Sequence, residues 1–329
     1  MPMLPLKIVQ AGYETAPGTV IAATRVIDME PGQATLKFDQ ELITVERAGS
    51  LSSAAFAYAG GYQPTIEFKG LPVSYTDLPW FANFFTTPIT TGTGASTDKN
   101  YLNTPSDTAD VGKRATFEVG GRDTWTTEFK VAGCAGKSFG LKWDRKGLWR
   151  MDATFLGMGI TKASKTGALT ARTVKHIVGA GTKTYIDAST LGSTVITARL
   201  ISGEFDVTED MSPQYTLDGT AADAYAPGSI ALTGNRKVTC KLKLLFTAAT
   251  EWDAFRAATI QKVRIKQAGP VLGVSFWSAQ LDVVGVWETY SFDDEGGALT
   301  ATIGLKALYD STLAADWALS TFNDQTTLV

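Results

Sequence analysis

Apolar and polar residues alternate along most of this chain. Ile66 and Phe68 flank Glu67, and Phe205 and Val207 flank Asp206. The same alternation runs through residues 125–131, 149–155, 263–265 and 299–305. A side-chain period of two places alternate residues on opposite faces of a strand, so the pattern predicts half-buried strands. The expected fold class is mainly β (α+β).

Two short polar segments have the composition of hairpin turns. Residues 144–147 (Asp-Arg-Lys-Gly) lie between apolar runs, and residues 293–297 (Asp-Asp-Glu-Gly-Gly) separate the last two expected strands. Glycine adopts a positive φ at little cost, which tight hairpins require. We therefore expect antiparallel pairing of strands that follow one another.

Only two segments, 76–85 and 250–259, have helical character. Each starts with a threonine suited to capping, Thr76 or Thr250, followed by an acid that faces the helix dipole. Leu78, Phe81 and Phe85 share one face of the first segment. Each helix is expected to lie beside the strands with its aromatic face inward.

The two helical segments belong to a longer repeat. A strand and its following helix recur at a constant spacing of 174 residues, which relates Thr65 to Thr239 and Phe81 to Phe255. Related strand segments precede them at 36–39 and 204–207. An internal duplication is the simplest explanation of this match.

The length of 329 residues suits two domains. We expect a first β domain over 1–160, a linker or arm over 161–195 and a second β domain over 196–329. Each domain is expected to be a β-sandwich or barrel with one short flanking helix. The polar, Gly-rich loop 86–112 is read as an arm that reaches another subunit.

Composition excludes several classes of protein. Hydrophobic residues make up 44% and charged residues 19%, which indicates a folded chain. A net charge of −3, with 30 basic and 33 acidic residues, lacks the basic excess of nucleic-acid-binding proteins. No window has the roughly 20 apolar residues that a bilayer span needs, and no membrane anchor or export signal is expected.

Candidate chemical sites fail on inspection, and we predict no catalytic, cofactor-binding or metal-binding residue. Cys134 and Cys240 lie in apolar patterns and are expected to be buried free thiols. His176 has no second imidazole to share a metal. The glycine-rich fragments 92–94 and 179–181 lack a nucleotide-binding context. The acidic run 293–297 is expected to be a solvated turn rather than a calcium loop.

Charged residues elsewhere fit strand faces. Glu204 and Asp206 alternate with core residues and are expected on one outward face. Basic residues cluster over 236–243 and 262–266. These two clusters indicate either solvated strand faces or a polar surface between subunits.

Several segments resemble the tail tube subunits of long, non-contractile-tailed bacteriophages. The resemblance starts with QAGYETAPGT at 10–19 and AAT at 22–24. It continues through ELITVER at 41–47, the strand and helix of 65–85, and WETYSF at 287–292. The likeness covers most of the chain, and no single motif is diagnostic.

The resemblance implies a structural role. Each half would be a tube domain, and neighbouring domains would join strands into a continuous barrel around a weakly acidic channel that DNA passes with only weak, non-specific contact. Six domains would close a ring, so a duplicated chain would form a homo-trimer with pseudo-hexameric symmetry. The rings would stack into a virion tube, assembled in the host cytoplasm, that contacts the tape measure, terminator and distal tail proteins.

Three alternatives remain at this stage. One is another component of the same fold lineage, such as a distal tail, terminator or injection-tube subunit. Another is a carbohydrate-binding β-sandwich that uses some of the eight tryptophans as stacking platforms. However, Trp125, Trp149 and Trp252 fall on apolar faces and are expected in the core. The last alternative is an enzyme with an unrecognised site.

Overall fold

The computed structural model describes residues 7–45, 56–94, 98–110, 112–121, 127–216 and 225–328. In the first half of the chain the elements are β1 (Lys7–Tyr13), β2 (Arg25–Val26), β3 (Ala34–Val45), β4 (Phe56–Pro72), α1 (Asp77–Ala82), β5 (Lys99–Asn103), β6 (Ala115–Gly121), β7 (Phe129–Asp144), β8 (Arg150–Leu156) and β9 (Gly159–Lys162). The second half contains β10 (Lys183–Asp187), β11 (Leu200–Thr208), β12 (Met211–Gln214), β13 (Ser229–Leu232), β14 (Lys237–Leu245), α2 (Thr250–Arg256), β15 (Gln261–Leu272), β16 (Ser275–Glu295), β17 (Ala298–Ala307) and β18 (Trp317–Asn323). The mainly β fold class is confirmed.

Strand alternation matches the sequence pattern. Ile66 and Phe68 on β4 are buried while Glu67 between them faces outward, and Phe205 and Val207 on β11 are fully buried. The buried faces of both strands belong to one large hydrophobic core, and a smaller cluster of Ala135, Leu156, Met211 and Ile230 lies apart from it. This core supplies most of the stabilisation of the folded chain, since burying apolar area is the largest favourable contribution.

Both helices form where expected, but their caps differ from the prediction. Thr76 precedes α1 without a side-chain cap bond; instead the hydroxyl of Ser74 accepts the backbone N–H of Asp77 at 3.0 Å. Thr250 is the first residue inside α2, which Ala249 precedes. Capping by the two threonines is therefore wrong, because a serine takes that role in α1 and the helix starts one residue earlier in α2.

The two hairpin turns are confirmed, with one difference. Gly296 and Gly297 connect β16 to β17 with φ of 62° and 81°. In the turn between β7 and β8, the carboxylate of Asp144 accepts the backbone N–H groups of Lys146 and Gly147, each at 2.7 Å. Gly147 does not have a positive φ, since this carboxylate shapes the turn instead.

The order of pairing is the same in the two halves. In the first half the antiparallel order is β1, β6, β7, β8, β4, β3, and in the second it is β10, β15, β16, β17, β14, β11. In addition, β9 pairs with β7 as β18 pairs with β16, and a helix follows both β4 and β14. We call these units the first repeat (β1–β9) and the second repeat (β10–β18).

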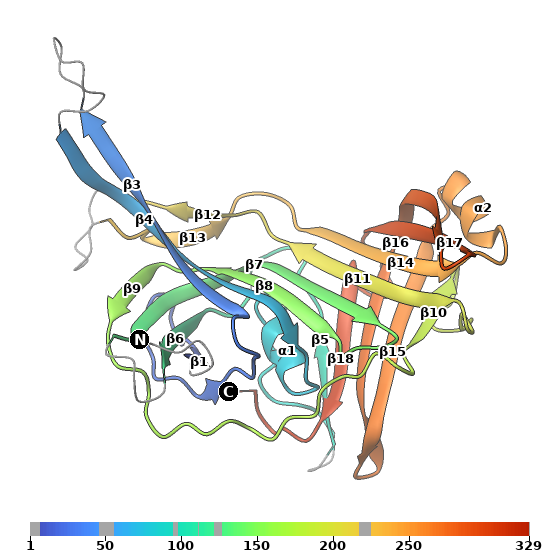
Figure 1. Cartoon of the computed structure of the whole chain (residues 1–329), viewed down its shortest axis with the longest axis horizontal. Helices are drawn as coiled ribbons and strands as arrows, with labels where there is room; N and C mark the ends of the chain where they lie inside the picture. The colour runs from blue at the N-terminus through green and yellow to red at the C-terminus, as the bar shows by residue number, and fades with distance from the viewer. Residues whose placement is uncertain are drawn as a thin grey trace.

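The repeats join edge to edge. Strand β11 pairs with β14 of its own repeat on one side and with β7 of the first repeat on the other. A single sheet therefore continues from one repeat into the next, with β8, β7, β11 and β14 side by side across the middle of Figure 1. We call the β7–β11 pairing the internal junction. The division into domains at 161–195 stays a prediction.

The two stretches expected to be arms pack on the chain itself. Loop 86–112 contains β5, which pairs with β18 and buries Tyr101. Stretch 161–195 contains β10, which pairs with β15, and the fully buried Ile177. Both stretches therefore contain a strand that was not predicted, because polar, Gly-rich sequence still pairs where a neighbouring edge is available. Their reach to another subunit stays a prediction.

Candidate assembly surfaces

Several described strands of the large sheet have a single strand partner, among them β2, β5, β9 and β10, and two further edges of this kind carry exposed apolar side chains. Among the described strands, β3 pairs only with β4, and residues 289–295 of β16 pair only with β17. An unpaired edge presents backbone N–H and C=O groups to any strand that approaches. In Figure 1 the hairpin of β3 and β4 projects at the upper left, while α2 lies beside β17 at the upper right.

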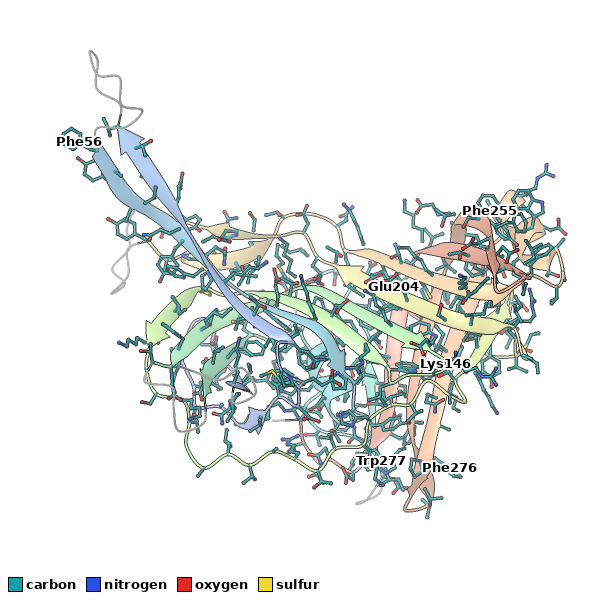
Figure 2. All side chains as sticks on the ribbon, viewed as in Figure 1. Phe56, Lys146, Glu204, Phe255, Phe276 and Trp277 are labelled. Atoms are coloured by element: carbon teal, nitrogen blue, oxygen red, sulfur yellow. The ribbon has the colours of Figure 1, made fainter. Side chains whose placement is uncertain are left out.

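The β3–β4 hairpin is unusually apolar for an exposed element. Figure 2 places Phe56 near its outer end. Six large hydrophobic side chains in its outer part are between 45% and 64% exposed: Phe38, Leu42, Ile43, Val45, Phe56 and Tyr58. Exposed apolar side chains gathered on one element commonly mark an interaction site. The pairing of β3 with β4 was not predicted, although the apolar residues Leu42, Ile43 and Val45 are visible in the sequence.

The second exposed apolar surface involves α2 and β16. Trp252 and Phe255 of α2 pack on Tyr290 of β16, with ring centroids 5.3 Å and 5.8 Å apart, and Phe292 is 51% exposed beside them. Only Glu251 of α2 is buried, whereas all six residues of α1 are. Figure 2 shows Phe255 at the end of the molecule away from Phe56.

The face of the sheet opposite the core is polar and carries both signs of charge. Lys142 lies 2.8 Å from Asp152 and 3.2 Å from Glu204. Lys37 lies 2.6 Å from Glu67. These ion pairs are exposed and contribute little to stability individually. They give the sheet a water-facing surface with interleaved positive and negative groups.

Asp206 is the most perturbed carboxyl on this polar face. It lies on β11 beside Glu204, as the sequence predicted. Burial, followed by the charge of the neighbouring Glu204, raises the pKa of Asp206 to about 6, although Lys142 and Lys241 act in the opposite direction. The carboxyl therefore takes up a proton within a pH range that proteins commonly meet.

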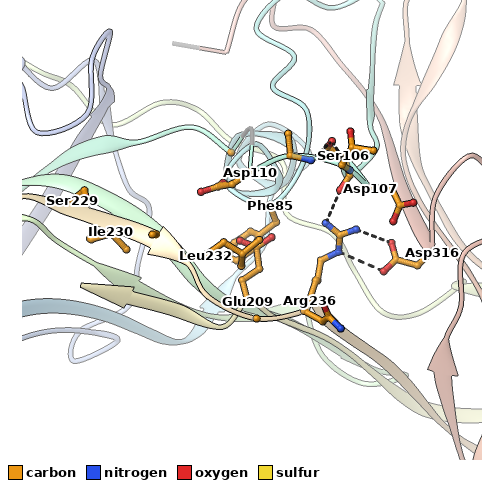
Figure 3. Close-up of a pocket in the computed structure, with 16 residues that line it drawn as sticks. Phe85, Ser106, Asp107, Asp110, Glu209, Ser229, Ile230, Leu232, Arg236 and Asp316 are labelled. Atoms are coloured by element: carbon orange, nitrogen blue, oxygen red, sulfur yellow. Dashed lines mark hydrogen bonds and ion pairs between the residues drawn. The ribbon is translucent and has the colours of Figure 1, made fainter. Parts of the chain in front are cut away.

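A polar cavity of about 900 Å³ opens between residues 106–110, strand β13 and residues 234–236, which precede β14 (Figure 3). Arg236 bridges its walls, donating to Asp316 at 3.3 Å and to the carbonyl of Ser106 at 3.2 Å. Arg236 was predicted to belong to a basic cluster on a strand. In the structure its hydrogen bonds connect two segments that are distant in sequence, at Ser106 and Asp316. Phe85 and Leu232 supply the apolar part of the lining.

Glu209 in this cavity is also perturbed. It is only 5% exposed, and its Oε2 has no hydrogen-bond partner among the described residues. Burial raises the pKa of Glu209 to about 7, and Asp110 and Asp316 act in the same direction against Arg236. A perturbed carboxyl in a cavity is a feature of many active sites.

The residues examined for chemistry occupy structural positions. Cys134 and Cys240 are buried free thiols, as predicted, and burial raises the pKa of both. The backbone of His176 forms an isolated antiparallel β-bridge with Ser74, and its side-chain Nε2 lies 3.1 Å from the carboxylate of Asp28. Within the described ranges, no cluster of three or more His, Cys, Asp or Glu side chains is arranged to hold a metal ion.

The tryptophans are mostly internal. Six of them are at most 4% exposed: Trp80, Trp143, Trp149, Trp277, Trp287 and Trp317. Trp252 is half-buried on α2, so its predicted place in the core is only partly right, and Trp125 lies outside the described residues. Buried indoles cannot stack on a sugar, which weakens the carbohydrate-binding alternative.

Two sheet units with the same strand order, open edges and exposed apolar elements are features of proteins that assemble with other subunits. The family described as phage tail tube protein matches residues 7–276, so the chain belongs to the phage tail tube protein family. Membership makes it a structural component of the phage tail and hence of the virion. None of the curated proteins matches the chain. Neither helix in the described part of the chain is long and apolar enough to cross a membrane.

Proposed function

We propose that this protein is the ring-forming subunit of a long, non-contractile phage tail, stacking into a tube through which the genome passes. The observation that carries the proposal is the internal junction, where two repeats share one continuous sheet. The same junction between chains would extend the sheet into a closed barrel without edges. The role is structural and involves no catalysis.

Three chains would supply six repeats to each ring. The matching strand order of the repeats supports this pseudo-hexamer, because equivalent units form equivalent contacts in a closed ring. Other tail proteins, including the tape measure, terminator and distal tail proteins, would contact the completed tube.

The polar face of the sheet would line the channel. It has interleaved charges rather than a basic surface, as the ion pairs of Lys142 with Asp152 and Glu204 illustrate. DNA needs clustered cations for tight binding, since affinity comes from releasing counterions. DNA would therefore slide past this face with only weak, non-specific contact.

Negative-stain electron microscopy and light-scattering mass of the concentrated protein test the proposal. Rings or tubes with a central channel and a ring mass of three chains are expected. A ring of six chains would keep the tube and overturn the pseudo-hexamer. A monomer at every concentration would overturn the tube itself, and a screen of glycans and of other tail components would then follow.

A further inference from the structure

The two repeats define which strand edges of separate chains correspond to the internal junction. Their correspondence starts from the sequence spacing, which relates Phe68 of β4 to Leu242 of β14. Phe68 pairs with Ala34 of β3, and Leu242 pairs with Gly203 of β11. Strand β3 is therefore the counterpart of β11, with Leu36 in the place of Phe205.

The other side of the junction follows in the same way. Phe68 also pairs with Ala153 of β8, and Leu242 with Ile303 of β17. Ala153 pairs with Phe139 of β7, and Ile303 pairs with Tyr290 of β16. Residues 289–295 of β16 are therefore the counterpart of the part of β7 that pairs with β11. The free edge of these residues corresponds to the edge of β7 that β11 occupies.

We infer that β3 of one protomer pairs antiparallel with residues 289–295 of β16 in the next protomer, in the register of the internal junction. Inside the chain, Val207 lies opposite Phe139 and Phe205 opposite Leu141. Transferred to the free edges, this register sets Phe38 opposite Tyr290, Lys37 opposite Ser291 and Leu36 opposite Phe292. This inference rests on the proposed function, because it names the partner edges by which tube subunits join.

The exposure of the side chains supports applying the register of the internal junction to the free edges. The four side chains of the internal junction, Phe205, Val207, Phe139 and Leu141, are at most 1% exposed. Of their counterparts, Phe38 is 47% and Phe292 is 51% exposed in the single chain. These two exposed aromatics are on the core-facing side of their strands, since Phe38 contacts Tyr62 and Phe292 contacts Phe246. Pairing would extend the apolar core across two protomers.

The two helices also correspond to each other, because each follows the equivalent strand of its repeat. Helix α1 lies against β18 of the second repeat and against β5, and is fully buried. Its counterpart α2 has no such cover in the single chain. The proposed pairing brings the first repeat of the next protomer to the side of β16 on which Trp252 and Phe255 are half-exposed.

The charged residues on the outward face are also compatible with the proposed pairing of β3 and β16. Inside the chain, Lys142 of β7 lies 3.2 Å from Glu204 of β11 across the junction. In the proposed register Lys37 is one diagonal step from Asp293, a separation that a lysine side chain spans. The contact joins two different edges, so it is heterologous and continues from chain to chain until a ring closes.

Paired cysteine variants test the register. Lys37→Cys and Ser291→Cys are both on the outward face of exposed strand segments, and directly opposed cysteines have the Cα separation that a disulfide needs. The native thiols Cys134 and Cys240 are fully buried and do not compete. We expect a mixture of the two single variants to form a covalent dimer upon mild oxidation, while each variant alone forms none.

Controls separate this inference from the proposed function. In the proposed register, Thr35 lies two positions away from the residue opposite Ser291. A cross-link between Thr35→Cys and Ser291→Cys, in place of one between Lys37→Cys and Ser291→Cys, would therefore overturn the register. Self-cross-linking of Lys37→Cys would overturn the head-to-tail arrangement. Rings seen by electron microscopy without any cross-link of the proposed pair would overturn the inference alone. Monomers at every concentration would overturn both.

A second variant tests the apolar contact without cysteines. Phe292→Asp is expected to abolish rings while the chain keeps its native circular dichroism, because this side chain is half-exposed in the single protomer. Val274→Asp, at a 92% exposed position in the turn between β15 and β16, is the matched control and should retain rings. Rings of normal stability in Phe292→Asp would contradict the proposed pairing.

Discussion

Individual residues on the sheet show how environment, rather than residue type, sets their behaviour. Asp152 and Asp206 are both aspartates on the polar face, on β8 and β11. Burial raises the pKa of Asp152, but hydrogen bonds from Lys142 and the backbone N–H of Gly70 outweigh it and lower this pKa overall. Asp206 lacks such donors, and its pKa is raised to about 6. Sequence alternation predicts the face of each residue but not these neighbours.

Asp206→Asn is expected to stabilise the protein above pH 6. Between about pH 4 and pH 6 the folded state holds a proton that the unfolded state has released, so wild-type stability falls as pH rises through this range. The substituted asparagine does not titrate, so the free energy of unfolding of the variant should exceed that of the wild type by roughly 1 to 3 kcal/mol at pH 7. This difference should disappear near pH 4. Urea unfolding at several pH values measures it. Asp152→Asn should have the opposite sign at pH 7.

Gly203→Ala is expected to destabilise the internal junction. Gly203 on β11 lies opposite Trp143 on β7, and an added Cβ would overlap the indole ring. Trp143 is itself held by stacking on Trp149 at 5.3 Å, so it cannot move away freely. Overpacking of this kind costs about 1 to 3 kcal/mol. Thermal unfolding measures the loss, and Gly159→Ala, which meets nothing within 4 Å, should leave stability unchanged.

At the scale of elements, the two helices are attached by equivalent ion pairs with different surroundings. Asp77 of α1 lies 3.5 Å from Arg25, which is fully buried over the ring of Trp80. Burial lowers the pKa of Arg25 to about 10, although Asp77 raises it. The corresponding Glu251 of α2 receives two hydrogen bonds from Arg199. The sequence predicted the acid in both helices. The same spacing of 174 residues relates Arg25 to Arg199, but only the structure shows that these arginines pair with the acids.

Glu251→Gln is expected to loosen α2 from the sheet. The guanidinium of Arg199 donates to both carboxylate oxygens of Glu251 at 2.9 and 3.0 Å and also to the carbonyl of Leu245. Removing one charge leaves the partly buried arginine unpaired and should reduce the free energy of unfolding by roughly 2 to 4 kcal/mol. Asp253→Asn, on the exposed side of the same helix, should change it by less than about 0.5 kcal/mol. Equal effects in both variants would refute a specific role for the ion pair.

The whole molecule behaves as more than two adjoining units. The internal junction pairs β7 with β11 over seven residues in sequence, and β5 of the first half pairs with β18 of the second. One hydrophobic core contains residues of both repeats, for example Phe139 and Phe205, whose rings lie 6.5 Å apart. The halves therefore share stabilising contacts that neither could make alone.

A single cooperative unfolding transition is expected for the monomeric chain. Because the core and the sheet are continuous across the repeats, loss of one repeat exposes the junction of the other. Far-UV circular dichroism and hydrogen exchange of β8 and β17 should report coincident urea midpoints. Separate midpoints would show that the halves unfold as independent domains, as a boundary at 161–195 would allow.

The sequence was sufficient for local structure because strand and helix periodicity depend on near neighbours. Alternation placed Ile66, Phe68 and Phe205 in the core, and glycines marked the turn at 296–297. The strand and helix repeated at a spacing of 174 residues form the equivalent parts of the two repeats. The strands within 86–112 and 161–195 were missed because each pairs with a strand far away in the sequence. The cap residues were missed for a local reason, since Ser74 caps α1 three residues before Asp77 and α2 starts at Thr250 itself.

The sequence by itself determined that the chain is mainly β, that its thiols are buried and that a strand-and-helix unit occurs twice. These features follow from side-chain hydrophobicity and short-range periodicity. Only the tertiary structure decided which strands meet across the repeats, in what register, and which edges stay open. Pairing between strands far apart in the chain depends on backbone hydrogen bonds and core packing, and the residues that meet there are not neighbours in sequence.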